Sequence, residues 1–230
     1  MGDFVGFAEP RIRAFNGYAA LAAADFLLRE HIPNVEAAFQ EDRVAANVVL
    51  VDGLWAAGLG YQFDTTETII ASLGAHAHQI VESVTGLANV SLEEEPDQVY
   101  AVAVDILGFV FDAPAQMYVF GAKFLHWCSR SHFPIVDRRA RRAISHLQQA
   151  GMLPDADGNG VIPPKQLLNL LDDYRTWIRF YSAFIGTLCP EQRDQLRELD
   201  WSTLPVPYRG ENSLLRILDK VFYAYDRGMG

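Results

Sequence analysis

The chain has 230 residues, 50% of them hydrophobic, and a formal net charge of −10. This apolar content is typical of a globular protein with a core and excludes a disordered chain. The sequence has no charged-then-apolar leader and no apolar run long enough to cross a bilayer, so we expect a soluble, cytoplasmic protein without a membrane partner. Two cysteines, Cys128 and Cys189, are too few for a disulfide framework.

Helical periodicity dominates the beginning of the chain. Apolar residues recur at helical spacing from Pro10 to His31, which predicts one helix that ends before Pro33. Asn34 is expected to cap a short helix. The segment from Arg43 to Trp55 is apolar on almost every side, so we expect a buried helix there. The glycines of Gly58-Leu59-Gly60 are interpreted as a helix stop and not as a phosphate loop, because no strand precedes them.

Two more helices are predicted before residue 112. Asp64 and Glu67 have the spacing of a capping box at the start of a helix that runs to about Thr85. A polar connection rich in glutamate follows, and Asp97 then begins an apolar helix that extends to Phe111.

The segment from Gly121 to Arg142 concentrates positive charge in an acidic protein. It contains one lysine and five arginines against one aspartate, a formal charge of +5, whereas the rest of the chain carries −15. Lys123, one of only three lysines beside sixteen arginines, lies among large apolar residues of a predicted helix. An extended segment from Phe133 to Val136 follows that helix, and Asp137 starts an arginine-rich one.

Lys123 and Asp137 are the candidate catalytic residues. A lysine becomes a nucleophile when burial or nearby cations favour its neutral amine. A carboxylate at a helix start accepts backbone N–H bonds, which hold it ionised. Because an amine can attack a sugar carbon while a carboxylate stabilises an oxocarbenium-like centre, the pair suits cleavage of a glycosidic bond. Two structural interpretations stay open, with Asp137 as a helix cap only and Lys123 as a lysine that extends its amine to solvent.

The arginines of this segment are candidate ligands for phosphate. Four of them cover the polar side of the helix that follows Asp137, near its N-terminus, where an anion is favoured. Pairing with the many carboxylates of the chain is the alternative for each of them. The candidate DNA phosphate-binding residues are Arg130, Arg138, Arg139, Arg141 and Arg142.

Two stretches around Lys123 and Asp137 resemble a known family. Val119-Phe120-Gly121-Ala122-Lys123 is similar to the end of the hairpin in helix-hairpin-helix DNA glycosylases of the 8-oxoguanine type, where a glycine-x-lysine supplies the catalytic lysine. Phe133-Pro134-Ile135-Val136-Asp137 and the basic helix after it resemble the segment that delivers the catalytic aspartate of that family. The closing helix from Ser213 to Lys220 also resembles the final helix of bacterial proteins with this fold.

This resemblance implies a DNA glycosylase that excises a damaged or modified base, in genome repair or in anti-phage defence. Lys123 would be the Schiff-base nucleophile, with lyase activity as a consequence, and Asp137 the essential carboxylate. DNA would be the partner, with the target nucleotide extruded from the duplex, and no cofactor or metal is expected. The alternatives are a non-enzymatic helical scaffold that binds nucleic acid or protein, and an N-glycosidase of nucleosides or RNA.

Two clusters of possible metal ligands are interpreted as structural. The segment from Asp155 to Gly160 copies the first half of a calcium loop, but Gln166 takes the place of the bidentate glutamate, which favours a polar turn. His126 and Cys128 point in different directions on a helix, so with His132 they do not predict a zinc site.

The remainder of the chain is also predicted to be helical. A helix that starts after Pro163-Pro164 is expected to reach about Leu188, Pro190 starts a short polar helix, the segment from Trp201 to Tyr208 is irregular, and Ser213 caps a final helix. An aromatic stripe at helical spacing is assigned to the core and consists of Tyr174, Trp177 and Tyr181.

The fold class that follows is all-α, a compact, DNA-glycosylase-like protein of roughly eight to ten helices. Residues 1–230 are expected to form one globular unit. A division into two helical lobes, at about 1–112 and 113–230 with the site between them, is one arrangement that the pattern permits.

Overall fold

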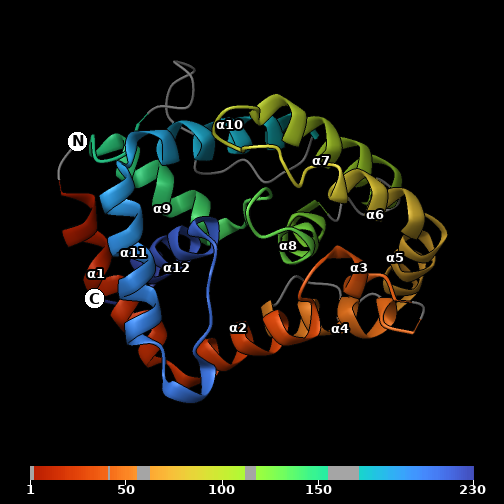
Figure 1. Ribbon diagram of the computed structural model, residues 1–230, viewed down its shortest axis with the longest axis horizontal. Coiled ribbons are helices and arrows are strands. Elements are labelled where there is room, and N and C mark those ends of the chain that lie inside the picture. The colour runs from red at the N-terminus through yellow and green to blue at the C-terminus, as the bar shows by residue number, and fades with distance from the viewer. Residues whose placement is uncertain (1–2, 41, 56–62, 112–117, 155–170) are drawn as a thin grey trace.

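The computed structural model describes residues 3–40, 42–55, 63–111, 118–154 and 171–230, and these residues contain helices and no strand (Figure 1). The all-helical class is therefore confirmed for the described part of the chain, with more helices than the sequence predicted. The elements are α1 (Phe4–Gly17), α2 (Ala19–His31), α3 (Val35–Ala38), α4 (Val44–Trp55), α5 (Phe63–Ala75), α6 (Ala77–Thr85), α7 (Pro96–Phe111), α8 (Tyr118–Cys128), α9 (Arg138–Gln149), α10 (Leu171–Thr187), α11 (Pro190–Thr203), the short 3₁₀ helix η1 (Val206–Tyr208) and α12 (Leu214–Asp226).

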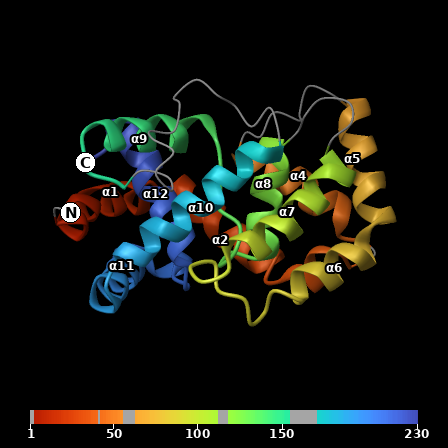
Figure 2. The same ribbon diagram turned by 90° about the horizontal axis from the view of Figure 1, so that it is seen from above.

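The helix α8 lies inside a ring made by the others (Figure 1), and it packs against α3, α4 and α7. Both chain ends lie at the same end of the molecule (Figure 2), where α1 contacts α11 and α12, and α12 contacts α9. Buried apolar side chains from Phe4 to Phe222 form one hydrophobic cluster. The first helix therefore belongs to the same packed unit as the last ones, and a lobe boundary near residue 112 stays a prediction.

The single helix predicted from Pro10 to His31 is wrong. The helix α1 begins earlier, at Phe4, because Asp3 caps it by accepting a hydrogen bond from the backbone N–H of Gly6 at 2.9 Å. Tyr18 then takes an extended conformation, with φ −83° and ψ 100°, and separates α1 from α2. Tertiary contacts explain the break, since Asn16 at the end of α1 binds Thr203 of α11 while α2 turns away towards α4.

The predicted helix from Asp64 to Thr85 is also divided, into α5 and α6 at His76. Both halves contact α7, but α5 also packs against α4, whereas α6 packs against α3. Asp64 lies in the first turn of α5 and not at its cap, because the helix begins at Phe63.

The helix α4 is not buried on every side. Val48 and Val51 are fully buried, whereas Val49 is 61% exposed. The helix from Pro190 is longer than predicted and includes Trp201, which was assigned to an irregular segment. Other local expectations hold, since the side chains of Asn34 and Ser213 cap α3 and α12.

Several features of the sequence lie outside the described residues, among them the Gly58-Leu59-Gly60 stop and the calcium-like loop that begins at Asp155. No helix in the described ranges has both the length and the apolar character that crossing a membrane requires.

Candidate active site

Lys123 lies on α8 and is 4% exposed. Three aromatic residues of the same helix, Phe120, Phe124 and Trp127, are fully buried and enclose this part of α8 in the core. The amine is therefore held inside the protein and does not extend to solvent. Burying a charged amine costs free energy unless a partner compensates, so its surroundings decide what it can do.

The extended segment 133–136 leads from α8 to Asp137, and two buried side chains hold it. His126 donates a hydrogen bond from Nδ1 to the carbonyl of Phe133 at 2.7 Å, and the Tyr174 hydroxyl donates to the carbonyl of Pro134 at 3.0 Å. Burial lowers the pKa of His126 to about 3, so its ring stays neutral and keeps this single donor. The segment therefore has a fixed path between α8 and α9.

Asp137 is the N-cap of α9, as the sequence predicted. Its backbone is extended, with φ −132° and ψ 177°, and its Oδ1 accepts hydrogen bonds from the backbone N–H groups of Arg139 at 2.8 Å and Ala140 at 2.9 Å. These bonds satisfy two of the free donors at the helix start and fix the orientation of the carboxylate. The second carboxylate oxygen is left for another partner.

That partner is Lys123. Its Nζ lies 3.5 Å from Oδ2 of Asp137, although the two residues are fourteen positions apart in the sequence. The lysine side chain is 5% exposed and the aspartate side chain 20%, so Asp137 is the member of the pair that reaches the surface. The structure thus brings the two predicted catalytic residues together, with separate tasks for the two oxygens of Asp137.

Asp219 of α12 is a third ionisable residue of this cluster, and the sequence analysis missed it. It is 5% exposed, and burial raises its pKa to about 7, with Arg216 opposing the rise and Asp137 adding to it. Lys123 also lies close enough to act on the charge of Asp219. A charged residue inside the apolar closing helix was the available signal, but the helix pattern does not say which neighbour it faces.

Tyr181 of α10 is the second residue that the sequence analysis missed, because it was assigned to an aromatic core stripe. The stripe is indeed buried. The Tyr181 hydroxyl, however, has no hydrogen-bond partner in the described part of the chain, whereas the hydroxyl of Tyr174 on the same helix has one. The charges of Asp219 and Asp137 both act on Tyr181, after the larger effect of burial, to raise its pKa well above its ordinary value.

The predicted phosphate-binding arginines do not form one surface. Arg130 donates to the carbonyl of Ile32 at 2.8 Å and so binds the C-terminal end of α2. Arg139 and Arg142 pair with Asp226 of α12, at 3.4 Å and 2.6 Å. Arg141 is buried at 5% exposure. Arg138 is exposed and makes no ion pair with a described residue, so it is the arginine of this set most available to a phosphate.

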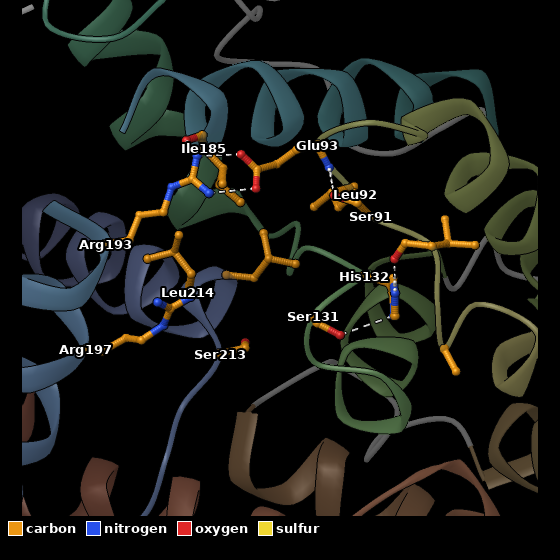
Figure 3. Close-up of a pocket in the computed structure, with 13 residues that line it drawn as sticks. Ser91, Leu92, Glu93, Ser131, His132, Ile185, Arg193, Arg197, Ser213 and Leu214 are labelled. Atoms are coloured by element: carbon orange, nitrogen blue, oxygen red, sulfur yellow. Dashed lines mark hydrogen bonds and ion pairs between the residues drawn. The ribbon is translucent and has the colours of Figure 1, made fainter. Parts of the chain in front are cut away.

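A separate pocket of about 340 Å³ lies between the loop before α7, the turn after α8, and helices α11 and α12 (Figure 3). Its walls include the Glu93–Arg193 ion pair at 2.6 Å and His132, whose Nε2 donates to the carbonyl of Val90 at 2.9 Å. Neither Lys123 nor Asp137 lines this pocket. Its polar groups are already paired with protein atoms, so it has no evident chemistry of its own.

Metal ligation has no support within the described ranges, where no group of three or more His, Cys, Asp or Glu side chains could hold an ion. His126 and His132 each use a ring nitrogen on a backbone carbonyl. Cys128 is buried, and burial raises the pKa of its thiol far above the ordinary value, while Cys189 is exposed.

A comparison of the chain with protein-family models finds no matching family, and comparisons with curated proteins and with solved structures find no match either. The functional argument therefore depends on the geometry of the Lys123–Asp137 pair and its neighbours.

Proposed function

We propose that this chain is a DNA glycosylase with associated lyase activity that removes a damaged or modified base. The observation that carries the proposal is the 3.5 Å approach of the Lys123 amine to the Asp137 carboxylate at the start of α9. A nucleophilic amine beside a carboxylate fixed by backbone N–H groups is the pair that attack at a sugar C1′ requires. DNA as the partner follows from the resemblance to helix-hairpin-helix glycosylases.

The reaction uses each residue for one task. The Lys123 amine first loses a proton and then attacks C1′ of the extruded nucleotide. The new N–C1′ bond forms while the C1′–base bond breaks. The electron pair of the broken bond leaves with the base, which takes up a proton. Asp137 stabilises the positive charge that develops at C1′. The nitrogen lone pair then expels the sugar ring oxygen, which is protonated, and an imine forms; loss of a C2′ proton from this imine expels the 3′ phosphate.

Access to the pair sets a requirement on the substrate. Asp137 is the more exposed member, so the sugar enters from its side and must displace the Asp137–Lys123 contact. The target nucleotide must also leave the base stack to reach a buried amine. In this proposal Arg138, which is exposed at the first position of α9, contacts the phosphate next to the extruded nucleotide.

The lyase step is tested by borohydride trapping on duplexes that carry 8-oxoguanine, hypoxanthine, uracil or ethenoadenine. The wild-type chain should form a covalent complex with one of these duplexes, and Lys123→Gln should form none, because a glutamine amide cannot make an imine. Lys165→Gln, which changes another of the three lysines, is the control and should trap as the wild type does. If Lys123→Gln still forms the covalent complex, or if Lys165→Gln does not, the nucleophile is an amine other than that of Lys123.

Base release is tested separately with Asp137→Asn. Asparagine is as good an N-cap as aspartate, so this variant keeps the helix start and removes only the negative charge. Excision should fall by about a hundredfold or more when it is measured below the melting temperature of the variant. That melting temperature should itself be lower than in the wild type, because the buried Lys123 loses its charged partner. An Asp137→Asn variant with full activity would favour the alternative in which this residue is only a cap and the protein a binding scaffold.

Nucleosides and RNA remain the alternative substrates of the same chemistry. Duplex binding through phosphate contacts weakens steeply as salt rises, whereas cleavage of a free nucleoside does not. Measuring excision from duplex DNA, from single-stranded RNA and from a free nucleoside at two salt concentrations distinguishes these substrates.

A further inference from the structure

Tyr181 combines complete burial with an unpaired hydroxyl. Its side chain has no exposed surface, and the hydroxyl oxygen finds no hydrogen-bond partner among the residues that the structure describes. Leaving a buried polar group unpaired costs free energy comparable to that of a lost hydrogen bond, and such groups are rare in native proteins. Tyr174, on the same helix, illustrates the ordinary case, because its buried hydroxyl donates to the carbonyl of Pro134 at 3.0 Å.

The position of Tyr181 connects this hydroxyl with the candidate active site. Its ring packs against Phe222 of α12 at 6.2 Å between centroids, and Phe222 follows Asp219 by one helical turn. Burial, and after it the charges of Asp219 and Asp137, raises the pKa of Tyr181 well above its ordinary value, so the phenol keeps its proton. Tyr181 thus offers a buried, neutral donor that packs on α12 and lies within the electrostatic reach of Asp219 and Asp137.

We propose that the Tyr181 hydroxyl donates a hydrogen bond to an acceptor on the extruded base, a carbonyl oxygen or an unprotonated ring nitrogen, and so helps to select the base. This inference rests on the proposed glycosylase function and adds a specificity-determining residue to it. A donor that is already desolvated and unpaired in the free protein gains a full hydrogen bond when the matching base arrives. A base without the acceptor leaves it unpaired, which is the basis of discrimination by buried polar groups.

The test compares Tyr181→Phe with Tyr174→Phe, the same change at two positions of α10. Removing an unpaired hydroxyl costs no hydrogen bond, so Tyr181→Phe should melt at or above the wild-type temperature. Tyr174→Phe breaks the bond to Pro134 and should melt lower. On the duplex that the wild type processes, Tyr181→Phe should lower kcat/KM for base release about tenfold.

Binding to a duplex with a tetrahydrofuran site, which has a sugar but no base, separates base contact from general damage. Tyr181→Phe should bind this duplex as the wild type does, because no base acceptor is present. Equal kcat/KM for Tyr181→Phe and wild type, or equal losses on the tetrahydrofuran and base-containing duplexes, would overturn the role of Tyr181 while leaving the glycosylase proposal intact. A wild-type chain that is inactive on every duplex would overturn both.

Discussion

Asp219 lies in a buried, charged environment that its neighbours in the sequence do not suggest. It hydrogen-bonds Arg216 one turn earlier on α12, and it is also within the electrostatic reach of Lys123 and Asp137. Burial raises the pKa of this carboxyl from 3.8 to about 7, against the lowering effect of Arg216. Asp219 therefore exchanges a proton near neutral pH at the edge of the candidate active site.

The stability of the protein should depend on this proton. Between the unfolded and folded pKa values of Asp219, 3.8 and about 7, the folded chain holds a proton that the unfolded chain releases. Unfolding free energy therefore falls as pH rises through this window, and the contribution is lost once pH exceeds the folded value. Asp219→Asn cannot ionise, so its stability relative to wild type should increase as pH rises from 3.8 to about 7 and should stay constant above that.

Urea denaturation at a series of pH values measures this difference. Asp97→Asn serves as the control, because it removes one carboxylate from an ion pair with Arg179 whose aspartate side chain is 64% exposed. Parallel stability curves for Asp219→Asn and wild type across the window would contradict the assignment.

At the scale of elements, α9 and α12 determine how much of the arginine cluster is available to DNA. Arg142 makes a two-point contact with Asp226, through Nε at 2.8 Å and Nη2 at 2.6 Å, and Arg139 reaches the same carboxylate. The polar side of α9 is therefore partly neutralised by the end of α12. Pairing with carboxylates, one of the two interpretations open at the sequence level, applies to these two arginines.

Asp226→Asn should release both guanidinium groups and strengthen binding to duplex DNA. We expect the slope of log affinity against log salt concentration to become steeper by about one to two units, since each phosphate contact contributes about one. Arg138→Gln is the opposing variant and should make the slope shallower by about one unit, because Arg138 is exposed and forms no ion pair with any residue in the described ranges. Fluorescence anisotropy over a salt series measures both, and an unchanged slope in Asp226→Asn would show that α9 does not contact the duplex.

At the scale of the whole molecule, a buried polar network joins the two ends of the chain. Arg216 of α12 binds Asp25 of α2 at 2.6 Å, and Lys220 binds Asp200 of α11 at 2.7 Å and Asn16 of α1 at 3.0 Å. The charged members are almost fully buried. Because Asp219 is also bonded to Arg216, this network continues into the candidate active site.

Arg216→Met should destabilise the protein by about 3 to 5 kcal/mol, because it leaves Asp25 buried without its bidentate partner. Arg197→Met is the control, since the side chains of its pair with Asp194 are 52% and 76% exposed, and such pairs contribute about 0 to 1 kcal/mol. Thermal and urea unfolding compare the two variants. Similar small losses for both would mean that the buried network adds no more than a surface pair does.

Local features of the fold could be predicted from particular residues. Asn34, Asp137 and Ser213 cap helices as expected, because a cap depends on a side chain and the backbone two or three residues later. The helix breaks at Tyr18 and His76 could not be predicted, since each depends on which distant helix the two halves pack against. The exposed side of α4 could not be predicted for the same reason.

In the candidate site, too, local features could be predicted and contacts between distant helices could not. The sequence by itself predicted helices along the chain, a lysine among the apolar residues of one helix and a carboxylate at the start of the next, since helix periodicity and capping are short-range properties. Only the tertiary structure decided that Lys123 and Asp137 meet, that Asp219 lies within their electrostatic reach, and that Asp226 pairs with two of the arginines. Those contacts depend on how α8, α9, α10 and α12 pack against one another. This packing is determined by the fit of side chains throughout the core and cannot be inferred from a local sequence pattern.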